Sequence, residues 1–419
     1  MSPSATAPGG QSLTVHQWLG RLAPDYLRRC GPALPARQRQ VLDTIRSCRT
    51  PARGGALFAC PDGHGFDYRY HSCNDRHCPL CGQTDADAWL ARQRQRLLLP
   101  APYFLITFTV PEPLRLFIRS HLQIGLDLLF GASAQALQDL AQNPKRLGAQ
   151  LGMLGVCHTW SRTLIFHPHV HYLIPGGGLS PDGRHWIAAK KFLLHHRALG
   201  DHCRTLFKAR LQKHHPDLLG QVPPSVWHTP WNVGAQAAGS GENALRYLAR
   251  YIFKTATGNR LIQQLPDGRL HWPYRDSQSR QLTALALEPH EWLRRFLQHI
   301  LPRHFARVRT FGWLHPAAKV RLNRVRALLH QKPFLTPAEQ DPWQPPPEPE
   351  PAPAFPQRST PMNREQAPMN REQALNPQPV LCPHCHQPML RVGAWRTQED
   401  LHRLFIAWRR QRRPDAHPP

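Results

Sequence analysis

Residues 166–174 have the sequence FHPHVHYLI, in which three histidines alternate with apolar residues. Side chains alternate between the two faces of a strand, so His167, His169 and His171 would share one face. Three imidazoles suit a divalent metal ion with positions left open to water or phosphate. Because Pro168 lacks an N–H group and belongs near a strand start or edge, we expect His169 and His171 to be the main ligands, with His167 at the margin. The alternative is a solvated or aromatic-packed histidine cluster without metal.

Further strands and helices are predicted on both sides of this segment. Residues 103–110 (YFLITFTV) are rich in β-branched and aromatic residues, and residues 153–160 and 164–174 form a second and third strand candidate. Segments with helical periodicity surround them, at residues 113–130, 190–219, 288–300 and 317–330. Residues 101–333 are therefore predicted to form one α+β domain.

A helix with two tyrosines is predicted over residues 240–255, SGENALRYLARYIFKT. Tyr247 and Tyr251 are four residues apart and would lie on one helix face. Three basic residues form a parallel stripe suited to a phosphate backbone, namely Arg246, Arg250 and Lys254. The alternative is that the tyrosines are ordinary core-edge residues and the stripe is solvated.

A cysteine-rich module lies between residues 60 and 81. Cys78 and Cys81 form a C-x2-C turn that supplies two zinc ligands, and the other pair must come from Cys60, His64 and Cys73. His71 and His77 are weaker candidates. Four protein ligands leave no open position, so we expect a structural zinc ion in an N-terminal DNA-binding module, residues 1–100. The alternative is a set of buried free cysteines.

The C-terminal part of the chain differs in composition. Eight of the sixteen residues from 341 to 356 are proline, and PMNREQA occurs twice, at 361–367 and 368–374. We therefore predict a disordered Pro-rich linker over residues 334–380 and a basic tail over residues 381–419. Cys382 and Cys385 form a second C-x2-C turn, which is either a degenerate knuckle or half of a site completed elsewhere.

The overall charge points to a polyanionic partner. The 419 residues contain 53 Lys and Arg against 27 Asp and Glu, a formal net charge of +26. Nucleic acid is such a partner, because cationic side chains release the counterions condensed on phosphates. No apolar run approaches the roughly 20 residues of a membrane span, and no secretory signal is evident. In a cytoplasmic protein, clustered cysteines indicate metal ligands rather than disulfides.

Several segments together resemble a known family. They are HTW at 158–160, HPHVHYLIPGGGLSPDGRHW at 167–186, YLARYIFKTATGNRL at 247–261 and CNDRHCPLC at 73–81. In this order they resemble the IS91-like rolling-circle insertion-sequence transposases, which are HUH endonucleases. The resemblance covers residues 15 to 330 and the tail knuckle. Arg162 stands where the family often has Gln, and Cys60-x3-His64 stands where many members have C-x2-C.

This resemblance implies a fold, a mechanism and partners. HUH domains have a central antiparallel sheet with helices on its faces, with the tyrosine helix packed toward the histidine face. His169 and His171 would hold Mg²⁺ or Mn²⁺, and a third ligand could be His167, His158 or Asn259. Tyr247 or Tyr251 would attack single-stranded DNA at the element ends and form a 5′-phosphotyrosine link. The expected location is the cytoplasm at the nucleoid, as a possible homo-oligomer.

Two other functions are compatible with parts of the sequence. A plasmid or phage rolling-circle initiator or relaxase shares the chemistry, although the zinc module and the GGGL and YLARY segments argue against it. A zinc-finger DNA-binding protein without catalysis, such as a decayed transposase, explains the charge and the cysteines but leaves the histidine strand and the tyrosines without a role.

Overall fold

The computed structural model describes residues 11–81, 89–90, 93–94, 99–189, 194–240, 242–243, 245, 257–276, 279–333 and 379–411. The chain divides into two compact units, which are described separately. The large unit contains the described residues of 1–48 and 72–334, and the small unit contains those of 49–71 and 335–419. This division differs from the predicted boundaries, because residues 49–71 of the expected N-terminal module join the expected tail.

The large unit is built on a five-stranded antiparallel sheet. Its strand order is β13-β5-β6-β4-β9. The strands are β4 (Pro102–Thr109), β5 (Gly152–Trp160), β6 (Phe166–Pro175), β9 (Asn232–Ser240) and β13 (Val308–Gly312). The predicted strands at 103–110, 153–160 and 164–174 are confirmed, and the antiparallel sheet agrees with the expected fold class. The two outer strands, β9 and β13, were not predicted.

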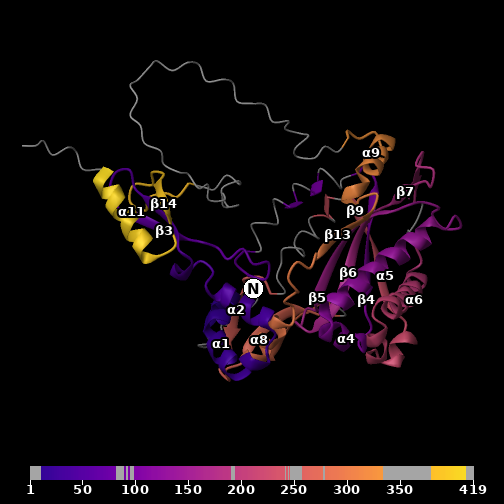
Figure 1. The fold of residues 1–419 in the computed structure, drawn as a ribbon, viewed down its shortest axis with the longest axis horizontal. Coiled ribbons are helices and arrows are strands. Elements are labelled where there is room, and N and C mark those ends of the chain that lie inside the picture. The colour runs from indigo at the N-terminus through magenta and orange to yellow at the C-terminus, as the bar shows by residue number, and fades with distance from the viewer. Residues whose placement is uncertain are drawn as a thin grey trace, which may run out of the picture. The chain divides into compact units, whose positions relative to one another are not determined.

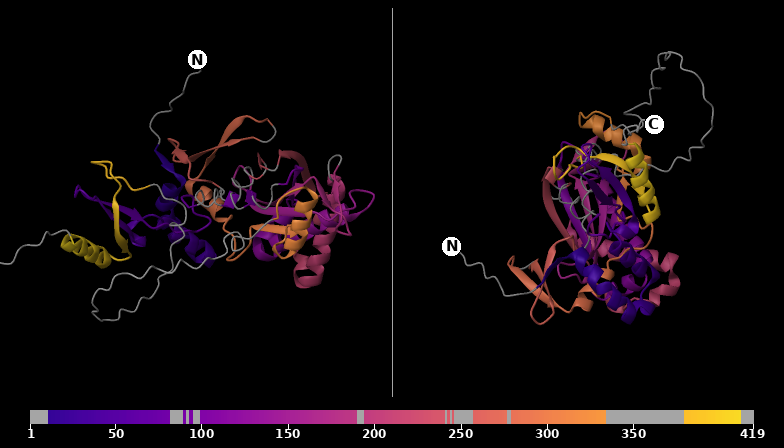
Figure 2. Two further views of the ribbon diagram at one scale, coloured as in Figure 1. Left: turned by 90° about the horizontal axis from the view of Figure 1, so that it is seen from above. Right: turned by 90° about the vertical axis from the view of Figure 1, so that its left-hand side faces the viewer.

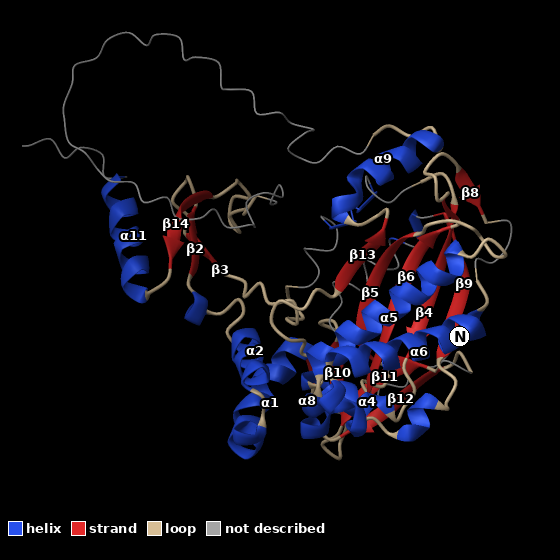
Figure 3. Ribbon diagram, turned by 45° about the vertical axis from the view of Figure 1, so that its right-hand side comes forward, coloured by secondary structure: helices blue, strands red, loops and turns tan. Residues whose placement is uncertain are grey.

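Helices cover one face of this sheet, as Figure 3 shows for α5 and α6. They are α4 (Leu114–Ser120), α5 (Leu122–Gln142) and α6 (His196–His214). Phe108, Val170 and Tyr172 point to this face and are fully buried in the main core. The Tyr172 hydroxyl lies 2.8 Å from the Ser133 hydroxyl of α5, so the polar end of the ring is satisfied inside the core.

The opposite face carries a second, smaller core. Leu105, Leu154 and Leu173 project to this side, where they pack with Leu245 and Trp313. The chain after β13 adds α9 (Lys319–Leu328), and the turn after β6 adds a short hairpin of β7 (Gly177–Leu179) and β8 (Trp186–Ala188). His169 and His171 alternate with Val170 and Tyr172 along β6, so the histidines lie on this second face.

A further part of the large unit joins the N-terminus to residues 261–297. Its four-stranded sheet has the order β1-β10-β11-β12, and Figure 2 shows its hairpin projecting away from the five-stranded sheet. The strands are β1 (Ser12–Thr14), β10 (Leu261–Gln264), β11 (Leu270–Arg275) and β12 (Leu282–Leu287). The helices are α1 (Val15–Cys30), α2 (Ala36–Arg46) and α8 (Pro289–Leu297). Thr14 and Gln17 form a capping box at the start of α1.

The small unit is a three-stranded antiparallel sheet with one helix. Its order is β14-β2-β3, with β2 (Gly55–Ala59), β3 (Phe66–Tyr70) and β14 (Leu390–Trp395). Helix α11 (Gln398–Gln411) follows β14 and is drawn in yellow in Figure 1. Short 3₁₀ turns complete the two units, at Gly31–Ala33, Pro51–Arg53, Pro216–Gln221, Pro224–Trp227 and Pro316–Ala318. Among the described helices, none is long and apolar enough to cross a membrane.

Candidate metal centres and the histidine face

Three histidines from two neighbouring strands come together on the second face of the five-stranded sheet. His158 of β5 lies opposite His169 of β6 in the strand register, and His171 is the next β6 residue on the same face. The ligand nitrogens of His158, His169 and His171 all lie within 4.8 Å of one another. Their ring centroids are 5.3 Å apart for His158 and His169 and 4.9 Å apart for the other two pairs. Three imidazoles at this spacing form a set that can bind one divalent cation.

Hydrogen bonds orient two of these rings. Nδ1 of His169 lies 2.6 Å from the backbone carbonyl of His167, and because a carbonyl only accepts, Nδ1 carries the proton. This tautomer leaves the lone pair of His169 on Nε2. Nδ1 of His171 lies 2.7 Å from the Thr107 hydroxyl of β4. Such contacts commonly fix the ring orientation of metal-binding histidines.

Burial keeps these rings neutral. It lowers the pKa of His169 to about 3 and that of His171 to about 4, since the charged form loses its hydration. A neutral imidazole is the form that donates a lone pair to a metal ion. At neutral pH the residues are therefore in the protonation state that metal binding requires.

The structure places the proposed third ligands differently from one another. His158 belongs to the compact group, whereas His167 lies beside it, with its ring centroid 5.3 Å from that of His169. Asn259 is engaged elsewhere, because its side-chain oxygen accepts the backbone N–H of His16. The sequence predicted the two adjacent strands that carry His158 and His169. It did not predict their register, and the register decides that His158 lies opposite His169.

The predicted tyrosines and the basic stripe lie outside the described residues. These are Tyr247, Tyr251, Arg246, Arg250 and Lys254. The chain just before them is described, and Leu245 is fully buried against Leu105 and Leu173 on the histidine side of the sheet. Leu245 therefore lies on the same sheet face as His169 and His171.

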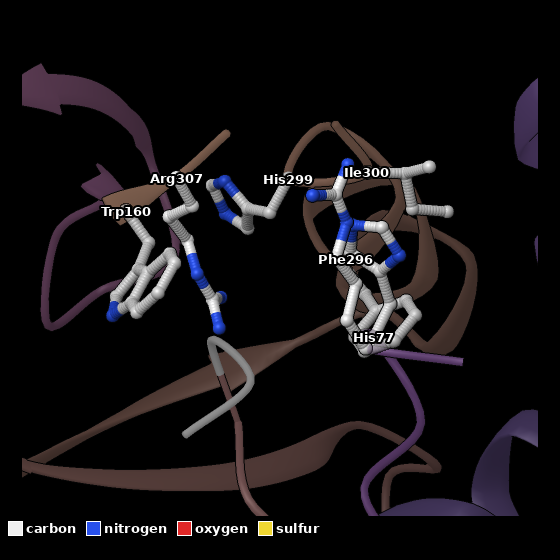
Figure 4. Close-up of a pocket in the computed structure, with 7 residues that line it drawn as sticks. His77, Trp160, Phe296, His299, Ile300 and Arg307 are labelled. Atoms are coloured by element: carbon white, nitrogen blue, oxygen red, sulfur yellow. The ribbon is translucent and has the colours of Figure 1, made fainter. Parts of the chain in front are cut away.

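A pocket of about 290 Å³, which includes space open to solvent, adjoins the histidine group. Trp160 lines it and is also in contact with His158, with ring centroids 4.9 Å apart. Figure 4 shows Trp160, His299 and Arg307 among the residues that line the pocket. Burial lowers the pKa of Arg307 to about 10, so the guanidinium remains charged at neutral pH.

The cysteines fall into two groups rather than the single set that was expected. Cys73, Cys78 and Cys81 are joined by Cys48 in the large unit, while Cys60 and His64 are joined by Cys382 and Cys385 in the small unit. In each group the ligand atoms lie within 4.8 Å of one another. The difference arises because Cys60, directly after β2, belongs to the small unit and is grouped there with Cys382 and Cys385. Cys48 supplies the fourth sulfur beside Cys73, Cys78 and Cys81.

The group in the large unit has the form of a structural zinc site. The sulfurs of Cys48 and Cys81 are 3.5 Å apart, and those of Cys73 and Cys81 are 3.7 Å apart. Hydrogen bonds among the four thiols lower the pKa of Cys48 and Cys81 and raise the pKa of Cys73 and Cys78, so the four sulfurs interact as one group. Cys48 and Cys78 are almost fully buried beside the α1, α2 and α8 core. Four sulfur ligands leave no position for a substrate.

Residues between these cysteines tie the group to the chain that leads into β13. Nε2 of His77 accepts the backbone N–H of Leu301 at 3.1 Å, while its Nδ1 lies 2.8 Å from Asp75. Arg76 donates to the carbonyls of Pro302 and Phe305 at 2.5 and 2.6 Å. His77 is thus a structural connector rather than a zinc ligand in this arrangement.

Comparison with known proteins identifies two matching family models. "Transposase zinc-binding domain" matches residues 19–110, and "Putative transposase" matches residues 152–321. The "Putative transposase y4qJ" of Sinorhizobium fredii is 34% identical over 318 residues, which cover 69% of this chain and 79% of that protein. The "Transposase for insertion sequence element IS801" of Pseudomonas savastanoi pv. phaseolicola is 30% identical over 302 residues, 66% of this chain and 70% of that protein. No solved structure matches the chain.

Proposed function

The chain belongs to the family of IS91- and IS801-type insertion-sequence transposases, and on that premise we propose that it cleaves and rejoins single-stranded DNA by the HUH tyrosine mechanism. The observation that carries the proposal is the group of His158, His169 and His171 on one face of the antiparallel sheet. A structural role alone does not call for three adjacent imidazoles, because an apolar side chain would fill the same space without the cost of burying polar atoms.

The three histidines would hold a divalent ion, which by the family resemblance is Mg²⁺ or Mn²⁺, and imidazole ligands accept other transition metals as well. Bound there, the ion would polarise a scissile phosphate. The protein's own contribution is orientation. His167 fixes the His169 tautomer through its backbone carbonyl, and Thr107 holds the His171 ring. Because the ligands are already neutral and oriented, little free energy is needed to reorganise the site when the ion binds.

Tyr247 or Tyr251 is the proposed nucleophile. A tyrosine oxygen attacks the phosphorus of the scissile phosphodiester and loses its proton to solvent. The bond from phosphorus to the 3′ oxygen breaks, and that oxygen leaves as a free 3′-hydroxyl after protonation. The new 5′-phosphotyrosine bond retains the phosphodiester linkage, so rejoining by a 3′-hydroxyl needs no external energy source. Two tyrosines would allow one to hold the first strand end while the other cleaves the second.

Single-stranded DNA and the element ends are the proposed substrate. Leu245, which lies two residues before Tyr247 in the sequence, is buried on the histidine face. Its position supports the proposal that a tyrosine acts at the histidine group. Trp160 contacts His158 and offers an aromatic ring on which a base could stack beside the metal ligands. Arg246, Arg250 and Lys254 are proposed backbone contacts. Such a reaction would take place in the cytoplasm at the nucleoid, with a homo-oligomer as one possible assembly.

The sulfur group Cys48, Cys73, Cys78 and Cys81 is the proposed structural zinc site of the transposase zinc-binding domain. Its position supports this role, because His77 and Arg76 connect the cysteine loop to residues 301–305 just before β13. Strand β13 pairs with β5, which carries His158. A closed zinc site there would stabilise the edge of the sheet that presents the histidines.

The decisive experiment is a cleavage assay with labelled single-stranded oligonucleotides that carry the element ends, in the presence of Mn²⁺. We expect a covalent protein–DNA adduct in denaturing gels, which disappears when Tyr247 and Tyr251 are both replaced by Phe. A His169→Ala, His171→Ala variant should form no adduct either. An adduct that survives the double tyrosine replacement contradicts the mechanism. Binding without any cleavage by the unmodified chain would favour a non-catalytic, decayed copy.

A further inference from the structure

We propose that the small unit contains a second zinc centre, built by Cys60 and His64 from the N-terminal part of the chain and by Cys382 and Cys385 from the C-terminal part. This proposal does not depend on the cleavage mechanism. It assigns a metal site to the tail knuckle and makes the tail an integral part of a folded unit. The zinc ion would act structurally, since the four residues complete a tetrahedral set.

The distances within the group fit a single zinc ion. The Cys60 and Cys385 sulfurs are 3.6 Å apart, and the Cys60 sulfur lies 3.5 Å from Nδ1 of His64. Zn–S bonds of about 2.3 Å and Zn–N bonds of about 2.0 Å in a tetrahedron give ligand separations of roughly 3.5–3.8 Å. The sulfurs are too far apart for a disulfide, whose S–S bond is about 2.05 Å. All four cysteine and histidine ligand atoms lie within 4.8 Å of one another.

Each ligand pair is held by a tight turn. In the first turn Cys60 donates its N–H to the carbonyl of Gly65 at 3.0 Å, and Gly63 donates to Cys60 at 3.1 Å. Gly63 has a φ of 83°, which favours glycine at this position. In the second turn the N–H of Cys382 donates to Gln387, and that of His386 donates to Cys382, both at 2.9 Å. Both turns therefore present ligands from a rigid backbone.

The sheet register brings the two turns to the same end of the small unit. Strand β2 ends at Ala59, directly before Cys60, and β14 begins at Leu390, shortly after Cys385. Ala59 is paired with Leu390 in the antiparallel ladder. The ligand pairs are separated by more than 300 residues in the sequence, yet strand pairing alone places them side by side.

The small unit has a limited core. The buried cluster around the ligands consists of Cys60, Cys382 and Met389, with Phe58 and Val380 packed beside them, and Leu57 and Trp395 are buried as well. Cys60 and Cys382 are each 1% exposed. Small domains with so few buried apolar side chains usually need a metal or a disulfide to remain folded. A zinc ion among these sulfurs would supply that stabilisation.

His384 provides a matched control because it lies in the same turn as Cys385. Its ring centroid is 6.1 Å from that of His64, but it is not among the four grouped ligands. His384→Ala should therefore leave zinc binding intact. His64→Cys should also retain zinc, while it replaces the nitrogen ligand by a fourth sulfur.

The test measures metal in the full-length protein. Tightly bound zinc is expected at two ions per chain, and at one ion per chain in the Cys382→Ser, Cys385→Ser variant. With Co²⁺ in place of zinc, near-ultraviolet thiolate-to-metal absorption reports only the cysteine sites and excludes the three-histidine group. We expect the double variant to lose about three sevenths of this absorption, because three of seven thiolates serve the second centre.

Two further variants keep the test decisive if the double variant folds poorly. The double variant should retain the four-sulfur spectrum of the large unit, which shows that this unit is folded. Cys48→Ser should give the reverse result and leave a three-sulfur, one-nitrogen spectrum, which His64→Cys shifts to the four-sulfur type. One zinc ion in the unmodified protein, or unchanged thiolate absorption in the double variant, would overturn the proposal. Loss of zinc from both centres in the double variant would also overturn the proposal, because it would show that the two sites are not independent.

Discussion

His158 and His169 lie directly opposite each other across the β5–β6 ladder, with their ring centroids 5.3 Å apart. This pairing adds an imidazole from a neighbouring strand to the pair on β6. Two ligands on one strand contact an ion along a single line. A third ligand from the adjacent strand allows the set to contact the ion from a second direction. The register of two strands thus decides which histidine completes the proposed metal site.

The first prediction separates His158 from His167. We expect His158→Ala to weaken Mn²⁺ binding by about 100-fold or more and to abolish detectable strand cleavage, because a direct ligand is lost. His167→Ala should reduce Mn²⁺ affinity by less than about 10-fold, since His169 bonds the backbone carbonyl of His167, which alanine retains. Calorimetric Mn²⁺ titration and the oligonucleotide assay would measure both effects. Equal losses of Mn²⁺ affinity in the two variants would contradict the assignment of His158 as the third ligand in preference to His167.

The second prediction concerns Thr107, whose hydroxyl lies 2.7 Å from Nδ1 of His171. Thr107→Val keeps the shape of the side chain but removes the hydrogen bond. Outer-shell partners of metal-binding histidines typically contribute about 10- to 100-fold to metal affinity or activity, and we expect a loss in that range. Thr107→Ser should restore most of it. Unchanged Mn²⁺ affinity and cleavage rate in Thr107→Val would show that the Thr107 hydroxyl does not contribute to the metal site.

Much of the central sheet was predictable because its inner strands are buried on both faces. Strands β4, β5 and β6 are long apolar or aromatic runs, which is the pattern of a covered strand. Strand β9, with the sequence NVGAQAAGS, is largely exposed and has almost no β-branched residues. Its place in the sheet depends on pairing with β4 rather than on local preference.

The metal groups were predictable only where their ligands are close in the sequence. Cys73, Cys78 and Cys81 form a compact motif, whereas Cys48 comes 25 residues before Cys73. Cys60 and Cys385 are 325 residues apart and meet through the pairing of β2 with β14. Spacing along the chain carries no information about such long-range pairing. The sequence therefore led us to expect one zinc site within residues 60–81, whereas the structure has two cysteine groups.

The third prediction is a loss of stability on mild acidification, caused by His299. This side chain is fully enclosed, its Nε2 donates to the Leu164 carbonyl, and its Nδ1 lies 3.2 Å from the Thr159 hydroxyl. Burial lowers the pKa of His299 to about 4. Below the unfolded-state pKa of about 6.5 the unfolded chain binds a proton that the folded chain does not. His299 should therefore contribute roughly 3 kcal/mol to a fall in stability between pH 6.5 and pH 4 and nothing above that window. The lowered pKa values of His169 and His171 add to the same fall.

Urea unfolding at pH 7, 6 and 5 would measure this contribution. His299→Gln should be less stable at pH 7, because a buried hydrogen-bonded ring is replaced, and it should show a shallower decline toward pH 5. The exposed His196 of α6 provides the control, and His196→Gln should follow the unmodified protein at each pH. A decline of the same slope in His299→Gln would show that other groups govern the acid sensitivity.

The fourth prediction concerns Cys48, the ligand that the sequence motif did not include. Cys48 is 1% exposed, and its sulfur is 3.5 Å from that of Cys81. Cys48→Ser should release the zinc ion of the large unit and reduce the free energy of unfolding by roughly 3 kcal/mol or more, since loss of a structural metal is among the most destabilising changes. Cys30→Ser, at the half-buried end of α1, should keep the zinc and change stability by about 1 kcal/mol or less. Zinc content together with thermal unfolding tests both variants. If Cys48→Ser retained its zinc with unchanged stability, Cys73, Cys78 and Cys81 would have to complete their site with a different fourth ligand.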